Sequence, residues 1–211
     1  MAPFAQALEV NPEQTSEQGW ASLNGLSEDS ERGAARRDAL LKSLDVQEGQ
    51  FNAIGVELGQ RYETGAVVSD GTSFPPYSRD PDLYYHPTTH PGASLPHVWL
   101  ERDRQKISTI DLAGKGAFSV IAGIGGQDWI AAAKELSAEL GIPIKGYSVG
   151  LRQEYDDVLG EWTRKRELED HGCLLVRPDR FVAWRSRSRV SNPKQELRSV
   201  MRQILHGASP A

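Results

Sequence analysis

Apolar residues recur at helical spacing along two adjoining stretches in the first half of the chain. The first stretch begins at Ser30 and carries alanines and leucines through residue 44, with basic residues on its polar side. In the second stretch, Phe51, Ile54, Leu58 and Tyr62 follow one another at intervals that place them on one helix face. The pattern predicts two helical pieces, and the second apolar stripe requires a partner surface.

Prolines dominate the next segment. Six of the twelve prolines fall between Pro75 and Pro96. Proline fixes φ and lacks an amide donor, so this segment forms neither a continuous helix nor a central strand. Tyr85, His97 and Trp99 lie in or beside it. We expect a rigid connector that packs against another surface through these side chains, with His97 as a buried hydrogen-bonding anchor.

The pattern becomes regular from about residue 105. It predicts strands at residues 107–112, 117–122 and 144–149 and on both sides of a turn at residues 177–180, and helices at residues 128–140, 161–170 and from 193 onward. We expect Trp129, on a helix face, and Trp184, on the last strand, to be core or interface anchors. The order β-β-α-β-α-β-β-α is that of a thioredoxin-like α/β sandwich over about residues 105–206, preceded by a helical, proline-rich extension.

The chain therefore divides into three predicted segments. Residues 1–29 are polar and contain glycines and a proline, and we interpret them as a loose N-terminal extension. Residues 30–104 hold the helical pieces and the proline-rich connector. Residues 105–211 form the α/β domain.

The net charge of the chain excludes some classes of binding partner. The formal net charge is −5, which argues against general binding to nucleic acid or to an anionic membrane. The basic run of Arg185, Arg187 and Arg189 is interpreted as a solvated edge rather than a phosphate site. No apolar run reaches the roughly 18 residues needed to cross a bilayer, and the N-terminus lacks the pattern of a secretory signal. We expect a cytoplasmic protein.

Few residues indicate a redox, metal-binding or phosphate-binding site. The single cysteine, Cys173, excludes an internal disulfide and a redox pair, and its apolar surroundings predict an inert thiol. His86 and His90 have the spacing of metal ligands on a helix, but the adjoining prolines exclude that helix, so no metal site is expected. The glycine-rich residues 123–126 lie between a predicted strand and a predicted helix, where a packing turn is favoured over a phosphate loop.

Four runs of sequence together resemble one known family. They are FNAIGVELGQRYETGAVVSDGT from residue 51, DPDLYYHPTTHPGASLPHVWL from residue 80, STIDLAGKGAFSVIAGIGG from residue 108 and GCLLVRPDRFVAWR from residue 172. In this order and spacing they resemble the C-terminal region of FAD-dependent aromatic-ring hydroxylases of the phenol and 2,4-dichlorophenol hydroxylase type. His90 and Ser94 depart from the arginine-rich form that their motif takes in that family.

The resemblance implies a thioredoxin-like domain that has lost its redox cysteines and serves packing and subunit association. It also implies FAD and NADPH for the full-length family or for a partner chain. This chain contains neither the Gly-x-Gly-x-x-Gly unit nor the later Gly-Asp segment that hold the flavin in such enzymes. We therefore expect no catalytic, cofactor-binding or metal-binding residue in this chain alone.

Three functions stay open at this point. The chain is a C-terminal association or stabilising module of a flavin-dependent aromatic monooxygenase, a subunit that completes a split FAD- and NADPH-dependent hydroxylase in trans, or a non-redox thioredoxin-like binding protein. The first two predict self-association or binding to a flavoprotein catalytic chain, through residues 30–70 in particular. Nucleic acid and membrane are not expected as partners.

Overall fold

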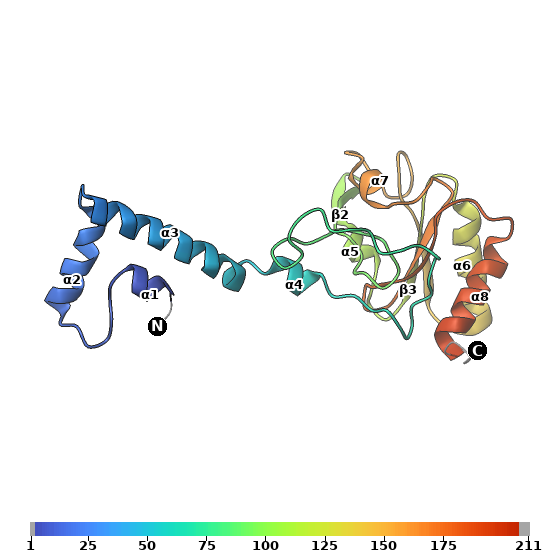
Figure 1. Ribbon diagram of the computed structural model, residues 1–211. Coiled ribbons are helices and arrows are strands. Elements are labelled where there is room, and N and C mark those ends of the chain that lie inside the picture. Colours follow the sequence, from blue (N-terminus) through green and yellow to red (C-terminus); the bar gives the residue numbers. More distant parts are fainter. Residues whose placement is uncertain (1–2, 207–211) are drawn as a thin grey trace.

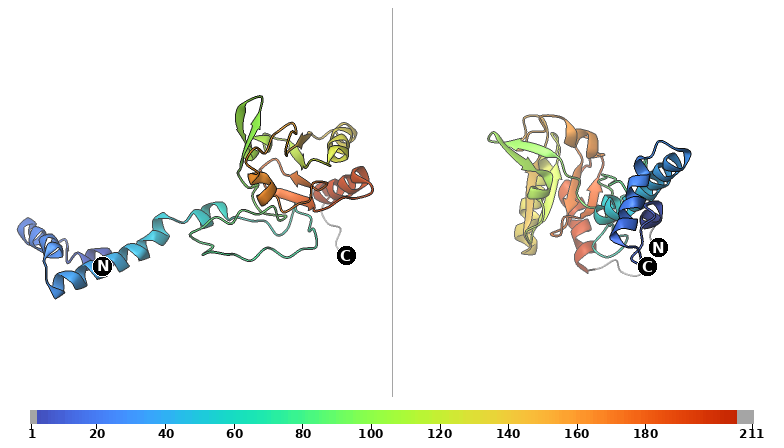
Figure 2. Two further views of the ribbon diagram at one scale, coloured as in Figure 1. Left: turned by 90° about the horizontal axis from the view of Figure 1, so that it is seen from above. Right: turned by 90° about the vertical axis from the view of Figure 1, so that its left-hand side faces the viewer.

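The computed structural model describes residues 3–206; residues 1–2 and 207–211, at the ends of the first and third predicted segments, lie outside it. Three parts follow one another along the chain (Figure 1): a helical arm of residues 3–51, an irregular connector of residues 52–98 and an α/β body of residues 99–206. The arm reaches away from the body, and the connector runs along one side of the body (Figure 2).

Helices make up the arm, whereas the body mixes helices with strands. The arm contains α1 (Pro3–Ala7), α2 (Ser16–Asn24), the 3-10 helix η1 (Gly25–Ser27) and α3 (Glu31–Phe51), and the connector contains α4 (Ile54–Leu58). The body contains β1 (Trp99–Arg102), β2 (Gln105–Ser108), α5 (Thr109–Leu112), β3 (Phe118–Ala122), α6 (Gln127–Leu140), β4 (Ile144–Ser148), α7 (Glu161–Lys165), β5 (Cys173–Val176), β6 (Val182–Ser186) and α8 (Pro193–His206). Within residues 3–206, no helix has both the length and the apolar character needed to span a membrane.

A four-stranded sheet forms the centre of the body, with the strand order β4-β3-β5-β6. β3 and β4 are parallel because α6 carries the chain back between them, whereas β5 pairs antiparallel with both β3 and β6. α6 and α8 lie side by side on one face of the sheet (Figure 1). The predicted order of elements is observed from β3 onward. The predicted fold class, an α/β sandwich preceded by a helical extension, is confirmed.

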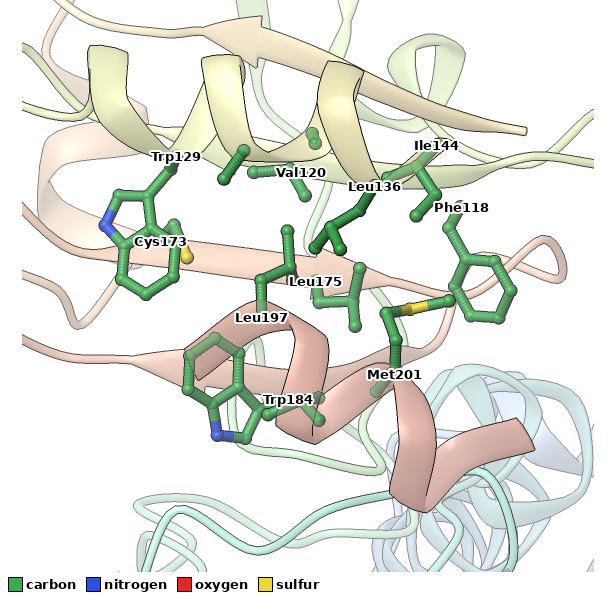
Figure 3. Close-up of a cluster of buried hydrophobic side chains, with 14 of the residues drawn as sticks. Phe118, Val120, Trp129, Leu136, Ile144, Cys173, Leu175, Trp184, Leu197 and Met201 are labelled. Atoms are coloured by element: carbon green, nitrogen blue, oxygen red, sulfur yellow. The ribbon is translucent and has the colours of Figure 1, made fainter. Parts of the chain in front are cut away.

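Each face of the sheet has its own hydrophobic core, since successive residues of a strand point to opposite faces. Val120 of β3 and Leu175 of β5 belong to the core under α6 and α8, which Figure 3 shows. Ile121 and Leu174, their neighbours in sequence, belong to the second core, together with Trp162 of α7. The sheet is therefore buried on both sides, as expected for apolar strands without polar alternation.

Trp129 and Trp184 are buried in the first core (Figure 3). Their rings meet edge to face, with centroids 5.8 Å apart. The indole N–H of Trp129 donates to the carbonyl oxygen of His171 at 3.0 Å, so its polar group is satisfied. The buried face predicted for this helix is confirmed, and Gly141 ends the helix in the left-handed conformation, with φ of 67°.

The strand predicted at residues 107–112 is wrong in its second half, because β2 ends at Ser108 and residues 109–112 form α5. Ser108 caps this helix. Its hydroxyl accepts a hydrogen bond from the amide of Ile110, and the carboxylate of Asp111 accepts one from the amide of Ser108. This reciprocal cap decides the local structure against the strand. The helix predicted at residues 161–170 likewise ends early, at Lys165.

The N-terminal segment interpreted as a loose extension contains the helices α1 and α2. Arg36, on α3, explains their order. Its buried guanidinium donates from Nη2 to the carbonyl oxygens of Leu8, which follows α1, and of Ser22 in α2, at 2.9 and 2.7 Å. One side chain therefore ties α1, α2 and α3 together. The sequence pattern does not indicate this role, because it depends on contacts that form only in the folded arm.

The apolar stripe that begins at Phe51 does not lie on one continuous helix. α3 ends at Phe51, the chain leaves the helical conformation at residues 52–53, and α4 covers only Ile54–Leu58. Gly55 brings α4 against the connector, because a Cβ at this position would lie 1.9 Å from the carbonyl oxygen of Pro81. Tyr62, which the sequence pattern placed on the same helix face, lies after the end of α4 and belongs to no helix.

Replacing Trp129 with alanine is expected to lower the free energy of unfolding by about 3–5 kcal/mol, because a buried ring is lost and a cavity remains. Denaturant titration followed by circular dichroism measures this loss. Trp99→Ala is the matched control, since Trp99 lies half-exposed on the β1–β2 hairpin and its removal leaves no internal cavity. Equal losses in the two variants would contradict the role of Trp129 as a core anchor.

Candidate functional site

A buried ionic cluster joins the connector to the last strand of the sheet. Arg185 of β6 donates from Nε to Asp70 Oδ2 at 2.5 Å and from Nη1 to Glu167 Oε2 at 2.6 Å. Its Nη1 and Nη2 also donate to the hydroxyls of Thr89 and Thr72, at 3.0 and 3.2 Å. The side chains of Arg185 and Asp70 are only 4 % and 3 % exposed. The cation is tolerated in this position because two carboxylates and two hydroxyls surround it.

The loop of residues 87–92 closes the cluster around Glu167. The hydroxyl of Thr88 and the amide of Thr89 both donate to Glu167 Oε2, at 2.8 and 3.1 Å. The hydroxyl of Thr89 donates to the carbonyl oxygen of Arg166 at 2.6 Å. Both threonines are fully buried. This proline-flanked loop is therefore a clamp on the chain that follows α7.

The cluster keeps its carboxylates charged. Burial opposes ionisation of Asp70, yet hydrogen bonds from Arg185 and Thr72 outweigh burial and lower the pKa of Asp70 to about 2. Burial also opposes ionisation of Glu167, and hydrogen bonds from Thr88 and Arg185 nonetheless lower its pKa below the ordinary value. Both groups are ionised at neutral pH, so Arg185 keeps both of its charged partners.

The interpretation of the basic run as a solvated edge is wrong for its first member. Arg187 and Arg189 are exposed, but Arg185 is buried. The reason is its pairing with Asp70 and Glu167, which lie 115 and 18 residues away along the chain. Only the fold brings these charges together.

Backbone hydrogen bonds also hold the connector along β6. The amide of Val68 donates to the carbonyl oxygen of Ala183, and the amide of Gly92 to that of Val182, both at 2.8 Å. Gly92 has φ of 91°, and a Cβ at this position would lie 1.8 Å from the carbonyl oxygen of Tyr62. Glycine is required here because two segments of backbone cross in direct contact.

Apolar side chains remain exposed where the arm meets the connector. Phe51 is 81 % exposed, and Ile54 and Leu58 are about half-exposed. Four more exposed apolar residues belong to the same stretch: Leu41, Leu44, Val46 and Val56. We call residues 41–58 the apolar segment. A concentration of this kind, on a chain whose body has two buried cores, is typical of an interaction surface.

The glycine loop of residues 123–126 does not fit a phosphate-bearing cofactor. The amide of Gly125 already donates to the carbonyl oxygen of Asp170 at 2.9 Å, and a Cβ on Gly125 would lie 2.8 Å from the ring of His171. The loop is the packing turn expected from the sequence. Burial raises the pKa of the Cys173 thiol, which stays protonated. Among residues 3–206, no group of three or more His, Cys, Asp or Glu residues is placed to hold a metal ion.

Comparison with known proteins decides the family. The profile of the aromatic-ring hydroxylase C-terminal family matches residues 88–208. The chain belongs to this family. It is 39 % identical over 203 residues to the 2,4-dichlorophenol 6-monooxygenase of Delftia acidovorans, a match that covers 96 % of this chain and 35 % of that protein. The phenol 2-monooxygenase of Pseudomonas sp. (strain EST1001) is 38 % identical, over 99 % of this chain and 34 % of that protein. The chain spans about a third of the length of these relatives.

Solved structures resemble this aromatic-ring hydroxylase domain closely. The flavin-dependent monooxygenase PieE, solved in complex with FAD and substrate, aligns with a TM-score of 0.84 and 43 % identity, over 98 % of this chain and 35 % of that chain. A ternary complex of aklavinone-11 hydroxylase with FAD and aklavinone aligns with a TM-score of 0.61 and 36 % identity, over 71 % and 26 %. The match to PieE takes in the arm and the connector as well as the body.

Five of the predicted site residues of this hydroxylase domain lie in the connector: Ile54, Leu58, Tyr62, Tyr85 and His97. Tyr62 is exposed, and its ring meets that of Phe181 edge to face at 4.7 Å. Tyr85 is partly buried, and its hydroxyl lies 3.4 Å from the hydroxyl of Ser94. The structure therefore separates both residues from the buried pair Trp129 and Trp184. A role of Phe51, Ile54, Leu58 or Tyr62 in an interface stays a prediction.

His97 and Trp99 lie together at the base of the hairpin, with ring centroids 4.8 Å apart. The prediction of a buried anchor is wrong for His97, which is exposed because the hairpin projects from the body. Its Nδ1 does form a hydrogen bond, 2.7 Å from the hydroxyl of Ser108. That hydroxyl also accepts from the amide of Ile110 as the cap of α5, so the pair holds a turn in place.

Asp70→Asn is expected to lower the free energy of unfolding at neutral pH by about 2–3 kcal/mol, because Arg185 loses a charged partner in a buried site. The folded-state pKa of Asp70 is depressed, so its contribution is present above pH ~4 and is lost as the pH falls towards 2. In the variant, this part of the acid-induced loss should be missing.

Urea titrations at a series of pH values between 7 and 2 measure both effects. The control is Asp103→Asn, since the side chain of Asp103 is exposed at the tip of the hairpin. An Asp70→Asn protein with the stability and acid profile of the unaltered chain would show that the cluster does not hold the connector.

Proposed function

We propose that this chain is the C-terminal association module of a flavin-dependent aromatic monooxygenase that acts on phenol-type substrates. In this proposal the module docks, through the apolar segment, on the part of the enzyme that holds FAD and uses NADPH. The observation that carries the proposal is the exposure of residues 41–58 beside a connector that is itself fixed to the body. A group of exposed apolar side chains, unlike a single one, marks a surface that another surface covers.

The body supplies no evident chemistry, which also favours association. Its single cysteine is buried and protonated, and its glycine loop is occupied by its own residues. The exposed His97, which precedes β1, bonds to the hydroxyl that caps α5. The relatives named above are monooxygenases about three times as long as this chain, and PieE was solved with FAD and substrate. Flavin chemistry in the same enzyme is therefore assigned to protein outside this chain.

The same surface serves a module joined to its catalytic part and a subunit that binds it in trans. The two arrangements differ in one measurable respect. A subunit in trans restores phenol-dependent NADPH consumption when mixed with a separate flavin-holding chain, whereas a module that functions only in covalent linkage does not.

The purified chain alone is expected to be colourless and inactive. After incubation with FAD and desalting, its absorbance spectrum should show no flavin band, and it should consume no NADPH with or without a chlorophenol. It should also fail to reduce insulin disulfides, because Cys173 has no partner cysteine. Retention of one FAD per chain, or phenol-dependent turnover, would overturn the proposal.

Phe51→Asp is expected to weaken docking about tenfold or more, because it places a charge at the centre of an apolar contact. The binding partner for this test is the flavin-holding N-terminal portion of a phenol 2-monooxygenase, ending where the match to this chain begins. Leu159→Asp is the control, since Leu159 is similarly exposed but lies next to α7 on the body. Light scattering over a range of concentrations reports self-association in parallel.

A monodisperse monomer that binds no such partner would contradict the assignment of residues 41–58 as a docking surface. Equal binding of the unaltered chain and of Phe51→Asp would contradict it as well.

A further inference from the structure

A cavity lies in the connector, between α4 and the chain from residue 74 to residue 94. Its volume is about 220 Å³. An engineered cavity of about 150 Å³ takes up benzene, so this one has room for a single six-membered ring with one small substituent. The cavity is formed by this chain alone.

Five aromatic rings line the cavity, and three of them, those of Phe74, Tyr77 and His86, contact one another. The centroids of Phe74 and Tyr77 are 5.6 Å apart, those of Tyr77 and His86 5.2 Å, and those of Phe74 and His86 5.9 Å. Such a cluster offers ring faces and edges at the separations that aromatic pairs prefer. The walls are tied to each other, because the amide of Val56 in α4 donates to the carbonyl oxygen of Asp82 at 3.3 Å.

Arg61 lines this cavity and also the adjoining hollow that Glu63 and His90 line, so its positive charge lies at the boundary of the two. Its guanidinium carbon lies 4.5 Å from the centroid of Phe74, which holds the group by a cation–π contact. Its Nη2 contacts Glu63 Oε1 at 2.6 Å, but the side chain of Glu63 is 73 % exposed, and exposed ion pairs contribute little. A guanidinium has five N–H donors in a planar fork that matches a carboxylate. Asp82 also lines the cavity; its amide donates to Asp80 Oδ1 and its carbonyl oxygen accepts from the amide of Val56.

We propose that this cavity binds a monocyclic aromatic carboxylate of the benzoate class, with its ring against Phe74, Tyr77 and His86 and its carboxylate paired with Arg61. A carboxylate offers the guanidinium two anionic acceptors for a bidentate pair, whereas the neutral hydroxyl of a phenol offers one uncharged acceptor, so a phenol is the weaker ligand. The site needs no flavin and no partner chain. Gly55, Val56 and Leu58 of the apolar segment belong to its lining, and an experiment on the chain alone tests it.

Titration calorimetry of benzoate into the full chain tests the site. Saturable binding at one benzoate per chain is expected. Arg61→Gln should weaken it about tenfold or more, and Tyr77→Ala should weaken it as well. Arg164→Gln and Trp99→Ala, which remove an exposed charge and a half-exposed ring outside the cavity, should leave the affinity unchanged. Circular dichroism confirms that each variant is folded, and if Tyr77→Ala is not, the surface variant Arg61→Gln decides.

Two further ligands separate the contributions of ring and charge. Cyclohexanecarboxylate keeps the charge without the aromatic ring, and phenol keeps the ring without the carboxylate; both should bind at least about tenfold more weakly than benzoate. The proposal is overturned by an absence of saturable benzoate binding at millimolar concentration, by unchanged affinity in Arg61→Gln, or by equal affinity for either of the two comparison ligands.

Discussion

Arg185 places a full positive charge on a buried strand of the sheet, and the position of the connector follows from it. A buried cation without partners costs several kcal/mol, so the chain folds only when carboxylates reach it. One carboxylate, Asp70, comes from the connector, and the other, Glu167, comes from the chain after α7. The same charge therefore fixes two segments that share no element of regular structure, and Thr88 and Thr89 complete the enclosure.

The attachment of the connector to β6 also fixes where the apolar segment begins to leave the body. Because residues 68–95 are held along β6, α4 starts from a defined place on the body, and α3 leads away from it into the arm. Within the arm, Arg36 holds α1, α2 and α3 together as Arg185 holds the connector, through two carbonyl oxygens and an ion pair of its Nε with Glu9 Oε1 at 3.5 Å. Two buried arginines thus organise the parts of the chain that have few apolar contacts of their own.

Sequence reasoning succeeded where regular burial decides the structure. The strands of the sheet, the buried face of α6 and the turn at residues 177–180 follow from apolar periodicity and from glycine and proline at turns. It failed where polar side chains decide. The cap of Ser108 turned a predicted strand into α5, and the pairing of Arg185 with Asp70 depends on residues far apart in sequence. The sequence alone does not distinguish an arginine that becomes buried, such as Arg185, from one that stays exposed, such as Arg187.

The connector has a consequence for where this domain can be divided. The family profile begins at residue 88, within the connector, so Val68 and Asp70 lie outside it. A chain shortened to start at that point would leave Arg185 without one of its two carboxylates. It would also uncover the carbonyl of Ala183 on β6, and unpaired groups on an edge strand recruit strands from other molecules. The smallest unit that keeps these contacts is thus longer than the stretch that the family profile matches, and a shortened chain would present β6 as an open edge.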